Sequence, residues 1–361
     1  MGVRIRHFFQ RTFDFPCQDC VCLYLRFKDT TLFSNTQIIE NKYSTVSARC
    51  KLYIDIYLHL ALNCFPKVLN KKAFNVIYSM AIKPYLCDMI QEDFQFYKPC
   101  KELQPYVRYY WVFKNNQLLN TLTFPIGCPQ IIFHKQTPLY IPELKTTQSE
   151  FSISGQVNYP SHLYADGNVE MIVVVFQPYV LKAFLNMPIS LLHNQEVSGY
   201  DLEDTKLKQL AAQIFNYEDT NSCITIIEQW LLSRITDALT SKTTCNLKRI
   251  ASAIQQLFIM PAISVTELAS TVCLSKKQFE RLFNELVGAN PKEYARIVRF
   301  QKSLKLLQHY TENANLAQIA YQCGYADQSH FIREFKQFSG YTPLSLLNVC
   351  KPYSDLFNNP I

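Results

Sequence analysis

Two stretches near the end of the chain place basic and amide side chains on one side of an expected helix, opposite an apolar side. An arginine can bind guanine with two hydrogen bonds, and a glutamine can bind adenine in the same way, so such a face suits a DNA major groove. An ordinary amphipathic surface helix is the alternative, and one stretch alone does not exclude it. The polar faces contain Lys276, Lys277, Glu280 and Arg281, then Gln328, Ser329, His330 and Arg333.

Both stretches belong to a motif that occurs twice between residues 264 and 343. Leu268 of the first copy corresponds to Ile319 of the second, an offset of 51 (319 − 268). Phe279 corresponds to Phe331, an offset of 52 (331 − 279). The extra residue therefore falls in the turn of the second copy. A duplication whose length changes only in a turn predicts two helix-turn-helix units.

Capping residues mark the ends of the expected helices. Ser264 followed by Glu267 has the capping-box pattern, and Ser275 is placed to cap the next helix. Gly288 and Gly340 stand where the second helix of each copy should end. The apolar stripes of these second helices are Phe279, Leu282, Phe283 and Leu286, and Phe331, Phe335 and Phe338.

One long helix is expected between the two copies. Pro291 suits its first turn. A helix over residues 292–308 would span about 25 Å, which is of the order of the roughly 34 Å between successive major grooves. Its expected buried residues are Ile297, Phe300, Leu304 and Leu307.

The end of this region resembles the AraC/XylS-type DNA-binding domain of bacterial transcription regulators. The resemblance lies in Gly324-Tyr325, Phe331, Phe335-Lys336, Gly340 and Thr342-Pro343, and it covers about the last 100 residues. It implies two helix-turn-helix units whose second helices read promoter DNA, and an activator that recruits RNA polymerase. The DNA-binding set that it implies is Lys276, Lys277, Glu280, Arg281, Gln328, Ser329, His330, Arg333 and Lys336.

Glu280 is atypical in a surface that contacts DNA. Its carboxylate could accept a hydrogen bond from a cytosine amino group, or it could pair with Lys276 or Lys277. The region from 246 to 343 carries twelve lysines and arginines and seven acids, a balance of +5 within the +7 of the whole chain. A basic domain of this kind is typical of a phosphate-binding surface.

Residues 1–79 differ from the rest of the chain. They contain five of the thirteen cysteines but no second close cysteine pair, so a metal site is not expected. They are interpreted as an atypical extension, either poorly ordered or not translated, with Met80 as an alternative start. A DNA-repair methyl acceptor that uses a cysteine and zinc site remains the rival function. The five cysteines are Cys17, Cys20, Cys22, Cys50 and Cys64.

Residues 80–200 combine aromatic and β-branched runs with Gly and Pro turns, which predicts an antiparallel sheet or small barrel. The order of these runs resembles the N-terminal domain of one group of AraC-type regulators. Trp111, Tyr109 and Phe133 could line a pocket or form core, and His134 could face a ligand or end a strand. The expected strands cover residues 106–113, 122–124, 130–134, 151–153 and 170–176.

Residues 201–245 are expected to form a helical linker. Leu207, Leu210 and Ile214 mark one helix. A longer stripe could pair with a second copy of the chain or pack on the β-rich domain. Residues 236–246 are polar and are expected to end in a hinge. The stripe consists of Ile224, Ile227, Leu231, Ile235 and Leu239.

The predicted architecture is α+β and multidomain. A barrel-like sensor domain (80–200) and a helical linker (201–245) precede an all-α domain (246–347) of two helix-turn-helix units, and 348–361 form a tail. The predicted function is that of a cytoplasmic bacterial regulator, not an enzyme, without a cofactor. Its predicted partners are promoter DNA, RNA polymerase, a small-molecule effector and a second copy of itself.

Overall fold

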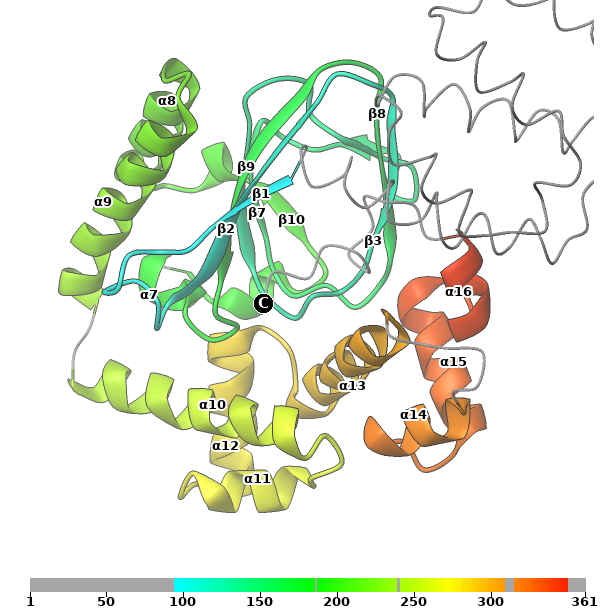
Figure 1. Ribbon diagram of the computed structural model, residues 1–361. Helices are drawn as coiled ribbons and strands as arrows, with labels where there is room; N and C mark the ends of the chain where they lie inside the picture. The colour runs from blue at the N-terminus through cyan, green and yellow to red at the C-terminus, as the bar shows by residue number, and fades with distance from the viewer. Residues whose placement is uncertain (1–93, 186, 239–240, 309–314, 350–361) are drawn as a thin grey trace, which may run out of the picture. The chain divides into compact units, whose positions relative to one another are not determined.

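The computed structural model describes residues 94–185, 187–238, 241–308 and 315–349 (Figure 1). The cysteines of the extension, residues 1–79 as a whole and most of the tail lie outside this part of the chain. Within the described residues, no helix is long and apolar enough to cross a membrane.

The β-rich domain consists of two antiparallel sheets. The larger has the order β1 (Phe94–Tyr97), β2 (Val107–Asn115), β9 (Val169–Phe176), β4 (Gln130–His134), β7 (Phe151–Ser154) and β10 (Glu196–Ser198). The smaller has the order β3 (Leu119–Thr123), β8 (Ser161–Ala165), β5 (Tyr140–Ile141) and β6 (Thr146–Thr147). The described strands form two facing sheets. They do not form a closed barrel, which was one of the two architectures predicted from the sequence.

Strand alternation explains why the larger sheet is buried on both faces. In β9, Met171, Val173 and Val175 lie between the two sheets, whereas Ile172 and Val174 face the helical side. A strand covered on both faces needs an uninterrupted apolar sequence, and residues 171–176 of β9 provide one. The predicted strand over residues 130–134 coincides with β4, and the one over 170–176 falls within β9.

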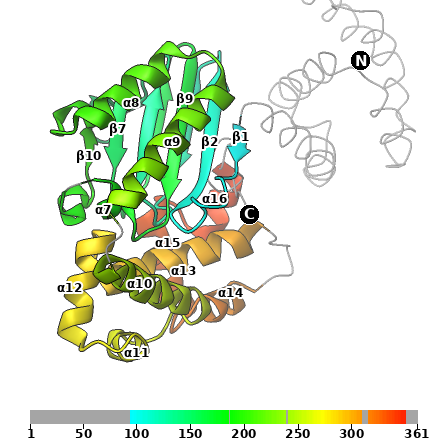
Figure 2. The same ribbon diagram turned by 90° about the vertical axis from the view of Figure 1, so that its left-hand side faces the viewer.

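Helices cover the outer face of the larger sheet (Figure 2). They are α7 (Leu181–Phe184), α8 (Thr205–Asn216) and α9 (Thr220–Ala238). Ile224, Ile227 and Leu231 of α9 are buried in the core of this domain, and Ile235 packs against it. The described residues of this stripe therefore pack on the β-rich domain, which is the second of the two alternatives drawn from the sequence, and Leu239 lies outside the described residues.

The C-terminal region is all helical. It contains α10 (Ser241–Ile259), α11 (Val265–Thr271), α12 (Lys276–Val287), α13 (Pro291–Gln308), α14 (Leu316–Gln322), α15 (Gln328–Ser339) and α16 (Pro343–Val349). The hinge expected at the end of residues 236–246 is not observed, because α10 begins at Ser241 and includes residues 241–246.

Candidate nucleic-acid interface

The helical region contains two three-helix units, each with its own core. The first consists of α10–α12 and the second of α13–α15. The duplication includes the first helix of each unit, because buried Ile250 corresponds to buried Phe300 at an offset of 50 (300 − 250). The offset of 51 at Leu268 and Ile319 and that of 52 at Phe279 and Phe331 complete the series.

The predicted caps are confirmed. Ser264 and Ser275 each form a capping box, with Glu267 and Gln278 as the respective partners. Asn315 accepts a hydrogen bond from the backbone N–H of Ala317. Sequence reasoning missed the cap of α15, where Asp327 accepts from the backbone N–H of His330 at 2.7 Å. These caps fix where each helix begins and therefore which side chains stand at its exposed N-terminal end.

The two turns differ in length as expected. Residues 272–275 separate α11 from α12, and residues 323–327 separate α14 from α15. Each turn has one left-handed residue, Cys273 (φ 56°) and Gly324 (φ 80°). Gly288 and Gly340 end the second helices in the left-handed conformation, with φ of 82° and 77°. The insertion therefore changes the turn and leaves both second helices twelve residues long.

Most of the predicted DNA-binding side chains lie at the surface of α12 and α15. Glu280 and His330 are half-buried. Among the described residues, Glu280 forms no ion pair, so the pairing with Lys276 or Lys277 is not observed. The exposed members are Lys276, Lys277, Arg281, Gln328, Ser329, Arg333 and Lys336.

The joining helix α13 contributes to both cores. Tyr294 and Val298 pack into the first unit, and Ile297, Phe300 and Leu304 pack into the second. Its eighteen residues span about 27 Å at 1.5 Å per residue. One rigid helix thus holds the two units at a fixed separation.

The β-rich domain contacts this joining helix through the loop of residues 124–129. The Tyr294 hydroxyl donates to the Gly127 carbonyl at 3.2 Å, and the Gln301 amide donates to the Pro125 carbonyl at 2.6 Å. Phe124 is buried in the core of the second unit, with its ring 5.9 Å from that of Phe300. Movement of this loop would therefore reach both units.

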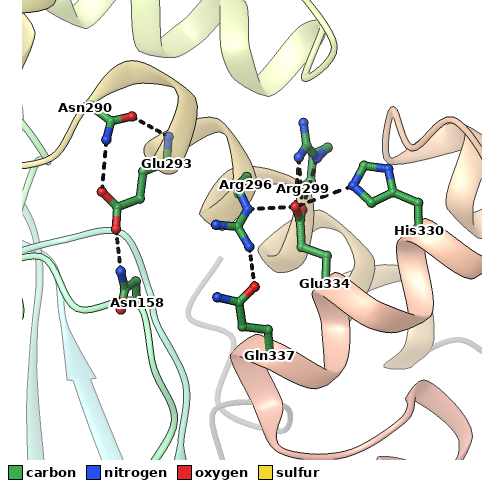
Figure 3. Close-up of polar contacts among 8 residues, drawn as sticks. All are labelled: Asn158, Asn290, Glu293, Arg296, Arg299, His330, Glu334 and Gln337. Carbon is green, nitrogen blue, oxygen red and sulfur yellow. Dashed lines mark hydrogen bonds and ion pairs between the residues drawn. The ribbon is translucent and has the colours of Figure 1, made fainter.

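A polar cluster adds a second contact at the start of α13 (Figure 3). Glu293 accepts hydrogen bonds from the side-chain amides of Asn158 and Asn290. His193 of the β-rich domain lies 3.3 Å from the same carboxylate. The first unit is also contacted directly, because Lys182 pairs with Glu285 on α12.

A cavity of about 160 Å³ lies between the two sheets of the β-rich domain. Tyr109 and Trp111 line it, whereas Phe133 belongs to the opposite face of the sheet and stacks on Phe151. Buried His134 does not line the cavity, and neither of its ring nitrogens has a hydrogen-bond partner among the described residues. Burial lowers the pKa of His134 to about 4.

One end of the cavity is polar. The Gln148 side chain donates to Glu196 at 2.9 Å, and burial raises the pKa of that carboxyl above its usual range. Gln148 Oε1 and Thr121 Oγ1 are buried without a hydrogen-bond partner among the described residues. These residues fall outside or at the edges of the strongest strand patterns, so the sequence did not mark them. The cavity shares Phe124 and Ile126 with the loop that contacts α13.

No group of three or more His, Cys, Asp or Glu side chains among the described residues could hold a metal ion. The described cysteines are free: Cys128, Cys223 and Cys323 are buried, Cys100 is half-buried, and Cys245 and Cys273 are exposed.

Two family models match separate parts of the chain. Residues 268–348 match the family model described as a helix-turn-helix domain, and residues 95–198 match a domain of unknown function, DUF6597. An uncharacterised HTH-type transcriptional regulator of Bacillus subtilis, YdeC, is 35% identical over 89 residues, covering 25% of this chain and 30% of that protein. The transcriptional activator RhaS of Escherichia coli is 25% identical over 146 residues, covering 38% and 52%.

Solved structures give weaker likenesses. ToxT from Vibrio cholerae is 13% identical and covers 66% of this chain and 97% of that chain, with a TM-score of 0.37. An AraC-type regulator from Chromobacterium violaceum is 23% identical, covering 29% of this chain and 92% of that chain, with a TM-score of 0.26. The matched parts span only about a third of YdeC and half of RhaS. Residues 268–348 therefore match a helix-turn-helix domain, and the relatives YdeC and RhaS are named as transcriptional regulators.

Proposed function

We propose that the chain binds promoter DNA sequence-specifically, with α12 and α15 in successive major grooves. The observation that carries the proposal is the pair of units whose exposed second helices present basic and amide side chains from the two ends of one rigid helix. Lysines, arginines and helix N-termini would hold phosphates, while Arg281, Gln328 and Arg333 would read base edges.

Selection of random DNA duplexes by the full-length protein tests this proposal. The expected result is enrichment of two short motifs about one helical turn apart. If no motif emerges and affinity simply falls as salt rises, the protein contacts only phosphates, and sequence-specific reading is wrong.

The regulatory outcome we propose is activation in the cytoplasm through contact with RNA polymerase. Its support is the likeness to RhaS, which is named a transcriptional activator. Transcription in vitro from a promoter that carries the selected site, with purified polymerase, tests the sign of regulation. A fall in transcript on adding the protein would make it a repressor.

We further propose that the cavity of the β-rich domain binds a small effector. Its walls are mostly aromatic and apolar, and its polar lining includes the Gln148 carbonyl oxygen, the Thr121 hydroxyl and Glu196. An apolar or aromatic molecule that carries a hydrogen-bond donor fits this lining. Because Phe124 and Ile126 also form the loop against α13, the occupied cavity has a direct route to the joining helix.

A thermal-shift screen of small aromatic amines and alcohols tests the effector proposal. A ligand at 100 times its Kd stabilises the protein by about 2.7 kcal/mol. A compound that binds in the cavity should lose its effect on a Thr121→Phe variant, which narrows the cavity. Equal stabilisation of the wild type and the variant would place the compound elsewhere.

A further inference from the structure

The apolar stripe of α15 contains one acidic residue. Glu334 follows Phe331 by three residues, next to Phe335, and its side chain is only 5% exposed. The corresponding residue of α12 is Leu282 (334 − 282 = 52), which is apolar and half-buried in the core of the first unit. A buried carboxylate is costly unless charged or hydrogen-bonding partners surround it.

Two arginines of the joining helix provide these partners (Figure 3). Arg296 Nε donates to Glu334 Oε2 at 2.8 Å, and Arg299 Nη2 donates to Oε1 and Oε2 at 3.0 and 3.1 Å. Arg296 also donates to Gln337 on the same helix. Glu334 and Gln337, which are three residues apart on α15, are therefore both bonded to arginines of α13.

Aromatic rings fix the planes of the two guanidinium groups. Arg296 lies over Phe338 at 5.2 Å from the ring centroid, and Arg299 lies over Tyr325 at 5.1 Å. The Arg299 side chain is 15% exposed and that of Arg296 is 33% exposed. Planar groups held between a carboxylate and a ring have little freedom to rotate. Both arginines are thus committed to the packing of the second unit.

The cluster extends to the first turn of α15. His330 Nε2 lies 3.8 Å from Glu334 Oε2, and the imidazole packs edge-on against Tyr325 at 5.4 Å between centroids. His330, Glu334 and both arginines line a crevice of about 420 Å³ whose other wall includes residues 261–264, just before α11. The acidic residue therefore lies at the junction of the two units, directly below the predicted reading face.

The first unit has no such cluster. By the offset of 50 residues, Arg296 and Arg299 correspond to Asn246 and Arg249 of α10. Asn246 and Leu282 line one cleft between the first unit and the β-rich domain. The same helix pair is therefore fastened by charge in the second unit and by apolar packing in the first.

We infer that Glu334 is a positioning residue that sets the reading face of α15, an inference that rests on the proposed DNA-binding function. Apolar side chains allow a helix to rotate slightly about its own axis, whereas a carboxylate that bridges two fixed guanidinium groups does not. This rotation decides whether Gln328, Ser329 and Arg333 point into the groove. Glu334 acts through these residues and does not itself contact DNA.

The inference is tested by measuring the affinity of the full-length protein for the intact duplex and for duplexes in which the first or the second half-site is scrambled. Discrimination at a half-site is the ratio of the affinities for the intact and the scrambled duplex. We expect Glu334→Leu to lower this ratio about tenfold or more at the second half-site and to leave the ratio at the first half-site unchanged. Glu334→Gln, which retains an acceptor, should lose less. Glu218→Gln, which removes an exposed acid from the turn between α8 and α9, is the control and should leave both unchanged.

A double variant keeps the test decisive if Glu334→Leu does not fold. Arg296→Asn with Glu334→Leu gives the second unit the residues of the first, and circular dichroism shows whether it is folded. Full discrimination at the second half-site by this folded variant would overturn the inference, as would an equal loss at both half-sites. Absence of half-site discrimination in the wild type would instead refute the proposed function itself.

Discussion

The two helix-turn-helix units have the same helix order and equivalent buried aromatic residues, yet they are held in place differently. In the first, the end of α12 lies against the β-rich domain, where a Cβ on Gly288 would come within 2.9 Å of the Ile189 carbonyl oxygen. In the second, the end of α15 is open, and nothing lies within 4 Å of a Cβ built on Gly340. Glu334 fastens α15 to the joining helix instead.

This difference indicates a division of roles within the duplicated region. The β-rich domain contacts α12 itself, whereas among the described residues it reaches the second unit through Leu122, Phe124 and the joining helix. A change in the β-rich domain would thus act on α12 directly and on α15 through α13.

Phe124→Ala should have the largest effect. Phe124 lies in a loop of the β-rich domain, but its phenyl ring is buried in the core of the second unit. Removing the ring should lower the free energy of unfolding by about 3–5 kcal/mol. Urea denaturation of the full-length protein measures it. Leu118→Ala is the control, because Leu118 is 62% exposed and its truncation should cost no more than about 0.5 kcal/mol. Equal costs for the two variants would show that Phe124 does not hold the β-rich domain against the second unit.

Acid should destabilise the β-rich domain through His134. Above pH 6.5 the imidazole is neutral in the folded and unfolded chains, so it contributes nothing. Below pH 6.5 the unfolded chain takes up a proton that the folded chain does not accept until about pH 4, so stability falls in this window. The shift corresponds to about 3 kcal/mol.

Melting temperatures between pH 7 and pH 4 check this prediction against a His134→Gln variant. The variant should lose less stability over that window than the wild type. Parallel curves would show that His134 binds protons equally well in both states, and the acid sensitivity would then lie elsewhere.

Gly288→Ala should cost more than Gly340→Ala. Both glycines have positive φ, which costs a residue with a Cβ about 1–2 kcal/mol. Only Gly288 also faces the backbone of the β-rich domain, so its variant must in addition displace Ile189. Chemical denaturation of both variants gives the difference directly. Equal costs would mean that the β-rich domain does not pack on α12 in solution.

The sequence predicted the duplication and most of its local structure because the relevant signals are short-range. The spacing of Phe279 and Phe331, the caps at Ser264 and Ser275 and the terminating glycines each depend on residues within one or two helical turns. The strand over residues 130–134 could also be predicted, because its aromatic and β-branched residues lie within five consecutive positions.

Long-range packing was harder to predict. The cavity-lining Gln148 and Glu196 lie on different segments that meet only in the folded domain. The polarity of residues 236–246 predicts a hinge at their end, but residues 241–246 belong to α10. Glu334 left a readable signal, because it occupies the place in the stripe where the first copy has Leu282. Only the structure shows that Arg296 and Arg299 meet it.

The central claim is that each unit reads its own half-site. We would measure Kd for the wild type, Arg281→Ala and Arg333→Ala on the selected duplex and on duplexes with one half-site scrambled. Scrambling the first half-site should cost the wild type about 1–3 kcal/mol and cost Arg281→Ala clearly less, and Arg333→Ala should behave in the same way at the second half-site. If each substitution weakens binding to all three duplexes equally, the arginines contact only phosphates, and the account of two reading units is contradicted.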